Sequence, residues 1–276
     1  MSTIATYARA ALPLVPGASL LPFVAGRGKQ MPPLERSLSG VRVDAKQLAE
    51  YARVCGFTLR DTLPATYLHI CAFPLHMQLM TDGRFPFPAV GLVHLSNRIT
   101  VHRPARTSEV FDLHVRVTPI EPHPKGKTFT IVSEARVDGE LVWEDHSTML
   151  RRGKGSGERA EREQAPLPEG PGVEWKLPGD LGRKYGAVSG DRNPIHIHPY
   201  TAKLFGFPRA IAHGMWTKAR CLAALEPLPD GYTVDVSFRK PILLPGRVTF
   251  AHEDGRFAVR SAKNPDTIHL EGTVTP

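Results

Sequence analysis

A short segment near the middle of the chain's second half gathers residue types that can move protons. In Ser189–Pro199, which reads SGDRNPIHIHP, Asp191 and His196 stand five residues apart with Asn193 between them. A carboxylate, an amide and an imidazole that titrates near neutrality are the groups that acid/base work on a bound water requires. The same residue types also occur in ordinary turns and helix caps, so the segment alone leaves a structural role open.

The backbone decides whether these groups meet. On a regular helix, residues five apart would point about 140° away from each other at ~100° per residue. Pro194 excludes the interior of a helix and favours an extended Asn193 before it, while Gly190 loosens the entry to the segment. We therefore expect a compact turn in which Asp191, Asn193 and His196 converge.

Composition limits the class of protein. The 276 residues are 41% hydrophobic and 22% charged, which is typical of a folded chain of one large or two small domains. The net charge of +8 favours anionic partners. The densest basic group, Arg151–Lys154, is followed at once by glutamates, so a nucleic-acid-binding arm is not expected.

Other features indicate a protein of a reducing compartment, and we predict the cytoplasm. Cys55, Cys71 and Cys221 are an odd number without CxxC spacing, so neither a disulfide framework nor a structural zinc site is predicted. The apolar stretch Ala10–Ala25 is interrupted by three prolines and lacks a strong basic leader, which argues against a signal peptide. The sequence contains no unbroken run of about 18 apolar residues, so no membrane span is predicted.

An internal repeat organises the chain. Residues 151–172 are rich in glycine, proline and mixed charge and are predicted to link a first repeat, 1–150, to a second, 173–276. Aligning Tyr51 with Tyr185 puts Cys55-Gly56 on Ser189-Gly190, and a later block matches Ser96 with Ser237. On the first alignment, Phe57 and Thr62 occupy the places of Asp191 and His196, so the first repeat is degenerate.

Each repeat is predicted to contain a helix, a turn, a long apolar helix and then several strands. The long helices are expected at Leu68–Met80 and within Ala212–Leu225. The predicted strands are 92–101, 109–117, 128–137, 141–150, 233–238, 247–253, 256–261 and 267–274. This pattern predicts an α+β fold in which two antiparallel half-sheets, each packed on one buried helix, join edge to edge.

The segment Tyr185–Met215, YGAVSGDRNPIHIHPYTAKLFGFPRAIAHGM, resembles the signature of the MaoC-like dehydratases, the R-specific or type 2 enoyl-CoA hydratases. The resemblance rests on S-G-D-x-N-P-x-H followed by A-H-G-M, and the unequal repeats resemble the double hot-dog members of that family. It implies reversible addition of water to a trans-2-enoyl thioester, giving the (3R)-3-hydroxyacyl thioester in fatty-acid metabolism. It further implies Asp191, His196 and Asn193 as catalytic residues, Gly214 as the oxyanion-hole residue, and no metal or redox cofactor.

Several histidines near this segment have other possible roles. A zinc site of Asp191, His196, His198 and His213 is disfavoured, because His196 and His198 would project to opposite sides of an extended segment. His213 is predicted to be a structural hydrogen-bonding residue, and His198 a surface residue. His69 falls at the place of His213 in the first repeat, but Ile70 follows it where glycine would be needed for an oxyanion hole.

Substrate contacts are less specific. Apolar residues of the first repeat are most simply core, and their functional alternative is a channel for an acyl chain: Phe57, Phe73, Leu75, Met77 and Met80. Arg239, Lys240 and Arg247 suit the phosphates of coenzyme A or a phosphopantetheine arm, and ordinary solvated charge suits them equally.

Alternative functions and partners remain open. The predicted partner is an acyl-CoA or acyl-carrier-protein thioester, and the fused repeats leave both a single chain and a homodimer possible. The alternatives are a hot-dog acyl-CoA thioesterase and a non-catalytic acyl-thioester-binding protein; neither of these needs the S-G-D-x-N-P-x-H spacing.

Overall fold

The computed structural model describes residues 30–156, 167–168 and 172–276. The stretch Ala10–Ala25 and most of the predicted linker lie outside the described residues. The basic group at the start of that linker is partly in a strand, because Arg151 and Arg152 pair with Lys127 and Gly126.

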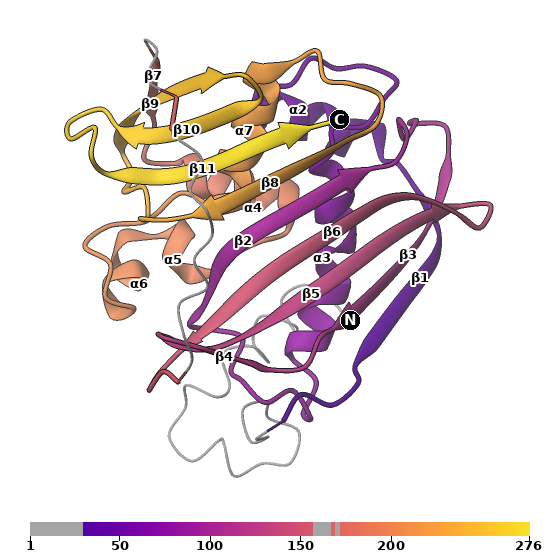
Figure 1. The fold of residues 1–276 in the computed structure, drawn as a ribbon, viewed down its shortest axis with the longest axis horizontal. Coiled ribbons are helices and arrows are strands. Elements are labelled where there is room, and N and C mark those ends of the chain that lie inside the picture. The colour runs from indigo at the N-terminus through magenta and orange to yellow at the C-terminus, as the bar shows by residue number, and fades with distance from the viewer. Residues whose placement is uncertain (1–29, 157–166, 169–171) are drawn as a thin grey trace.

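In the described part of the chain, eleven strands form one continuous antiparallel sheet (Figure 1). The strands are β1 (Glu35–Arg42), β2 (Leu92–Val101), β3 (Val110–Val117), β4 (Glu121–His123), β5 (Gly126–Val137), β6 (Glu140–Arg152), β7 (Val173–Leu177), β8 (Tyr232–Phe238), β9 (Gly246–Glu253), β10 (Arg256–Ser261) and β11 (Ile268–Thr275). Their order is β1-β3-β5-β6-β2-β8-β11-β10-β9-β7, with β4 paired to β5. The second half of this order repeats the first in reverse, which is what two related half-sheets joined at one edge produce.

The two half-sheets join edge to edge, as predicted, and the strands that pair at the join are β2 and β8. Ser96 lies directly opposite Ser237, the residue that the sequence comparison matched to it. Equivalent residues of two repeats lie opposite each other only where the approximate two-fold axis that relates the repeats passes between them. Two positions along β2, Arg98 pairs with Asp235 at 2.7 Å. The join hides two strand edges that would otherwise expose unpaired backbone groups.

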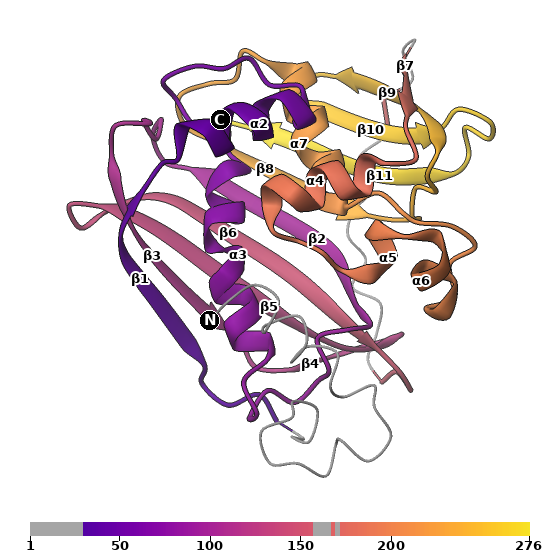
Figure 2. The same ribbon diagram turned by 180° about the vertical axis from the view of Figure 1, so that it is seen from behind.

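The helices lie on one face of the sheet, as Figures 1 and 2 show from opposite sides. They are α2 (Ala45–Cys55), α3 (Tyr67–Met80), α4 (Leu181–Ser189), α5 (Pro194–Ile197), α6 (Pro199–Leu204) and α7 (Gly214–Leu225). The long helix α3 packs on β1, β3 and β5, and α7 contacts β11 and α2. Most of α3 is buried, which fits its apolar sequence. None of the helices in the described part of the chain is long and apolar enough to cross a membrane.

All eight predicted strands and both long helices are confirmed within two residues at their ends. The predicted order within each repeat was wrong at its start, because β1 and β7 precede the first helices. Most residues of β1 are exposed, so its sequence has no apolar alternation to reveal a strand. The short β4, α5 and α6 were also missed.

Candidate active site

The segment that carries Asp191 and His196 contains a one-turn helix rather than a simple turn. Helix α4 ends at Ser189, and α5 begins at Pro194, whose fixed φ suits the first position of a helix. Asn193 has the extended conformation expected before proline, with φ −54° and ψ 126°. Its side-chain oxygen accepts a hydrogen bond from the N–H of Ile195 at 3.4 Å, so it caps α5.

Two glycines of helix α4 allow the segment from Asp191 to His196 to pack closely against this helix. A Cβ at Gly182 would stand 1.9 Å from the carbonyl oxygen of His196, and one at Gly186 would stand 2.7 Å from that of Asp191. These glycines lie one turn apart and so share a face of α4. The missing side chains allow the backbone of the segment to rest directly on the helix.

His196 is buried and has one ring nitrogen engaged. Its Nδ1 lies 2.8 Å from the carbonyl oxygen of Ile211, so Nδ1 carries the proton and donates it. The other nitrogen, Nε2, is left as an acceptor. Burial lowers the pKa of His196 below its ordinary value, and the nearby Asp191 offsets this only in part. His196 is therefore neutral at neutral pH and able to accept a proton.

Asp191 is ionised beside it. Burial raises the pKa of the carboxyl group, but His213, His196 and the N–H of Asn193 outweigh burial and bring the pKa below its ordinary value. The Asn193 N–H donates to Asp191 Oδ1 at 3.1 Å. The carboxylate side chain keeps 28% of its surface exposed, so it remains accessible to a small molecule.

His213 supports both residues, which confirms its predicted hydrogen-bonding role. Its ring stacks on that of His196 with centroids 3.7 Å apart, and its Nε2 donates to the carbonyl oxygen of Asp191 at 3.0 Å. Burial lowers the pKa of His213 to about 3, so it is neutral as well. Its Nδ1 is buried without a hydrogen-bond partner among the described residues.

Gly214 is the first residue of α7, with His213 as the N-cap. An N–H in the first turn of a helix has no partner within the helix, and Gly214 N donates to no other group in the described part of the chain. The helix dipole places partial positive charge at this end. A Cβ here would come within 2.9 Å of the Phe238 ring, so only glycine fits without movement.

Three of the four residues weighed as metal ligands converge. Ligand atoms of Asp191, His196 and His213 all lie within 4.8 Å of one another, so this group has the donors that a metal ion would need. His198 stands apart: it is exposed, as predicted, and its Nδ1 accepts from the N–H of Tyr200 at the start of α6.

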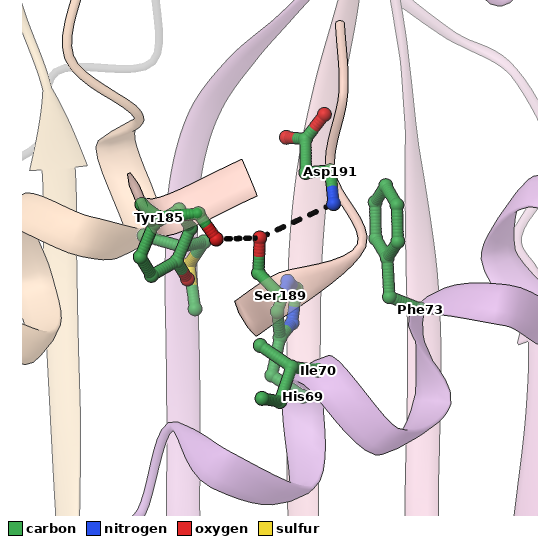
Figure 3. Close-up of a pocket in the computed structure, with 7 residues that line it drawn as sticks. His69, Ile70, Phe73, Tyr185, Ser189 and Asp191 are labelled. Carbon is green, nitrogen blue, oxygen red and sulfur yellow. Dashed lines mark hydrogen bonds between the residues drawn. The ribbon is translucent and has the colours of Figure 1, made fainter. Parts of the chain in front are cut away.

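A small pocket of about 20 Å³ lies between α3 and α4, with the space for one water-sized group (Figure 3). Its lining residues come from both repeats: His69, Ile70, Phe73, Tyr185, Ser189, Asp191 and Met215. Figure 3 shows Ser189 between Tyr185 and Asp191: its hydroxyl donates to the Tyr185 carbonyl and accepts from the Asp191 N–H. Asp191 is thus tied to the wall of the pocket through α4.

The first repeat contributes to this pocket differently from expectation. Of the five apolar residues weighed for an acyl channel, Phe73 lines the pocket, while the other four belong to the buried core and are not among its lining residues: Phe57, Leu75, Met77 and Met80. His69, considered only as a possible oxyanion residue, also lines it. The sequence held one sign of this role for His69. Asp145 lies two residues after Trp143 in β6, so both side chains point to the buried face of the sheet, and a buried carboxylate needs a polar partner.

The three basic residues considered for phosphate binding lie outside this pocket. Arg239 is paired with Glu271, and Arg247 lies 3.6 Å from Glu174, while Lys240 is exposed. Carboxylates therefore already balance the two guanidinium groups.

Comparisons with known proteins show which family the chain belongs to. A family model described as a MaoC like domain matches residues 176–268. The 3-hydroxyacyl-thioester dehydratase X of Mycobacterium tuberculosis is 35% identical over 243 residues, which cover 86% of this chain and 83% of that protein. The chain belongs to the MaoC-like dehydratase family.

Other members of the MaoC-like family extend the comparison. The enoyl-CoA hydratase ChsH3 of Mycobacterium tuberculosis is 31% identical over 227 residues, covering 74% of this chain and 77% of that protein. The crystal structure of HtdX from the same organism has a TM-score of 0.77 at 32% identity and covers 87% of this chain and 99% of that one. The sheet with its two long helices is a double hot-dog fold, as predicted.

Proposed function

We propose that this chain is a hydro-lyase that interconverts trans-2-enoyl thioesters and (3R)-3-hydroxyacyl thioesters in fatty-acid metabolism, with its active site on the second repeat. One observation carries the proposal: an ionised Asp191 and a neutral His196 with a free Nε2 converge beside Gly214, whose N–H has no partner among the described residues. The names of the related dehydratase and hydratase support the same reaction.

In the hydration direction, Asp191 and His196 hold one water between the carboxylate and Nε2. The dyad takes a proton from this water as its oxygen adds to Cβ of the enoyl thioester. The electron pair of the double bond moves through Cα towards the thioester carbonyl, whose oxygen gains negative charge. The N–H of Gly214 and the dipole of α7 stabilise that oxygen. The dyad then returns a proton to Cα, so the addition is balanced and the reverse steps release water.

Asn193 serves this site as a positioning residue. Its N–H holds Asp191 Oδ1, and its side-chain oxygen caps α5, which carries His196. It therefore sets the distance between the two reacting side chains.

The substrate handle is coenzyme A or an acyl-carrier protein, and the acyl chain enters beside Asp191 towards the first repeat. The pocket wall formed by Ile70, Phe73 and Met215 supports this placement. At about 20 Å³ the pocket accepts only a short extension of the chain unless Phe73 moves. The three cysteines are all free thiols, which supports a reducing compartment such as the cytoplasm.

The test is turnover of trans-2-enoyl-CoA thioesters of several chain lengths, followed by loss of enoyl absorbance and chiral analysis of the product. We expect (3R)-3-hydroxyacyl-CoA, and we expect Asp191→Asn and His196→Gln each to lower kcat at least about 100-fold while remaining folded. The matched control is His198→Gln, in the same segment but exposed and outside the group, which should keep near-normal activity.

Other products would contradict the proposal. Release of free CoA thiol without a hydroxyacyl product would indicate a thioesterase. Absence of turnover with both CoA and carrier-protein thioesters, despite binding, would indicate a binding protein.

A further inference from the structure

A buried histidine and carboxylate pair lies in the first repeat, outside the proposed dyad. Asp145 on β6 has no solvent exposure, and its Oδ2 lies 2.8 Å from Nδ1 of His69 on α3. Its other oxygen accepts from Asn97 Nδ2 at 2.9 Å and from Ser147 Oγ at 2.8 Å. Burial raises the pKa of Asp145, but the adjacent His69, with His76 and Lys218, outweighs burial and holds this pKa well below its usual range.

This arrangement is costly for a core. Removing a carboxylate from water is unfavourable, and well-packed apolar side chains at such positions commonly stabilise a fold at least as well. The cluster extends to the other repeat, because Lys218 on α7 donates from Nζ to the backbone and side-chain oxygens of Asn97. The first repeat has therefore kept a connected polar cluster where a purely apolar acyl channel would need none.

His69 is the member of this cluster that reaches the pocket. It lines the pocket with Ile70 and Phe73, and its side chain is 8% exposed. Because Asp145 occupies Nδ1, Nε2 is the nitrogen left for the pocket, and it has no hydrogen-bond partner among the described residues. Asp145 fixes the plane of the ring and so the direction in which Nε2 can form a bond.

We infer that His69 is a specificity-determining residue whose Nε2 accepts a hydrogen bond from a hydroxyl group on the acyl chain of the substrate. The favoured substrates are enoyl thioesters with a hydroxyl group a few carbons beyond the double bond. This inference rests on the proposed hydro-lyase function. The pocket volume of about 20 Å³ suits one oxygen-sized group beside His69. A plain alkyl chain would cover Nε2 without giving it a partner, which is unfavourable.

His76 provides a matched control. It lies on the same helix, is buried like His69, and its Nε2 bonds Ser133 Oγ at 2.7 Å. The rings of the two histidines are in edge contact, with centroids 5.3 Å apart. His76 is not among the residues that line the pocket. Replacing it tests the effect of losing a buried imidazole from α3 without changing the pocket wall.

The experiment compares kcat/KM for trans-2-hexenoyl-CoA with that for its 4-, 5- and 6-hydroxy derivatives. We expect the native chain to prefer one oxygenated substrate about tenfold over the plain one, the scale of one hydrogen bond. His69→Leu should abolish or reverse this ratio, and Asp145→Asn should weaken it because the ring loses its fixed orientation. His76→Leu should keep the ratio.

Two outcomes would overturn the inference: no oxygenated substrate is preferred by the native chain, or His76→Leu removes the preference as fully as His69→Leu. Calorimetric binding of saturated hexanoyl-CoA and its hydroxylated counterparts gives the same ratio without turnover. It tests His69 even if hydration is never seen, so failure of the proposed reaction and failure of this inference can be told apart. If His69→Leu does not fold, His69→Gln replaces it, because glutamine keeps a polar side chain at this position but lacks the imidazole Nε2.

Discussion

At the scale of single residues, the site depends on two groups held in complementary states of charge. Asp191 and His196 both have pKa values below their ordinary ones, but for opposite reasons. Neighbouring imidazoles and an N–H favour the charged carboxylate, whereas burial favours the neutral imidazole. The result is an anion and a proton acceptor side by side at neutral pH, and this is the combination that activation of water requires.

These shifts predict the pH dependence of turnover. Protonation of His196 at Nε2 removes the acceptor, so kcat/KM should fall as the pH falls through its pKa. Because that pKa is lowered, the acidic limb should lie below the ordinary histidine value of about 6.5, with no loss between about pH 6.5 and 8 from this group. The groups facing His196 are Asp191 and His213, and His213, with a pKa of about 3, stays neutral throughout.

The measurement is a pH profile of kcat/KM together with NMR titration of the His196 ring. An acidic limb centred at or above pH 7 in both would contradict the assignment of a neutral His196.

At the scale of elements, glycines in α4 and α7 allow the close contacts that position the proposed reacting groups. Gly182 allows the backbone of His196 to contact α4 directly. Gly214 leaves room for the Phe238 ring against the first turn of α7. The same helix α4 ties Asp191 through Ser189. The polar groups of the site are therefore held by packed helices, and small errors in that packing become errors in the distance between the dyad residues.

Gly182→Ala tests this arrangement. The added Cβ would stand 1.9 Å from the carbonyl oxygen of His196, so the segment must shift. We expect a loss of about 1–3 kcal/mol in unfolding free energy and a larger proportional loss of kcat than of substrate binding. Denaturant unfolding and steady-state kinetics measure the two effects.

Gly179→Ala is the control for that substitution. It lies just before α4, and a Cβ there would make only an ordinary contact of 3.6 Å with Pro245. Equal losses of activity in both variants would contradict the role given to Gly182.

At the scale of the whole molecule, the two repeats form one sheet and share buried contacts. β2 pairs with β8, Gln47 donates to the Val188 carbonyl at 3.0 Å, and Trp216 donates to that of Val54 at 3.0 Å. The pocket has walls from both repeats. The degenerate repeat thus contributes walls to a pocket that also contains Asp191, one of the two proposed reacting residues.

Cutting the chain within residues 157–166 should test this interdependence. The first repeat alone would expose the ten-residue edge of β2, so we expect it to aggregate or pair with itself rather than remain a stable monomer. Co-expressed halves should recover a one-to-one complex with most of the activity, because the paired surfaces are unchanged. Size-exclusion chromatography and turnover measure this. A stable, monomeric first repeat would show that the repeats are independent domains.

The sequence by itself determined the two-repeat α+β architecture and the segment holding Asp191 and His196. These features depend on local patterns: alternation in strands, apolar helices, and a motif within a few residues. Even there, β1 was missed because its exposed residues carry no pattern, and Pro194 was given a turn where it begins α5.

Only the tertiary structure decided what surrounds the motif. His69 and Asp145 are 76 residues apart, and their contact exists because α3 lies across the sheet that contains β6. Likewise, His213 meets Asp191 across 22 residues through the start of α7. Such contacts, and the charge states they impose, follow from how packed elements bring distant side chains together, which no short stretch of sequence encodes.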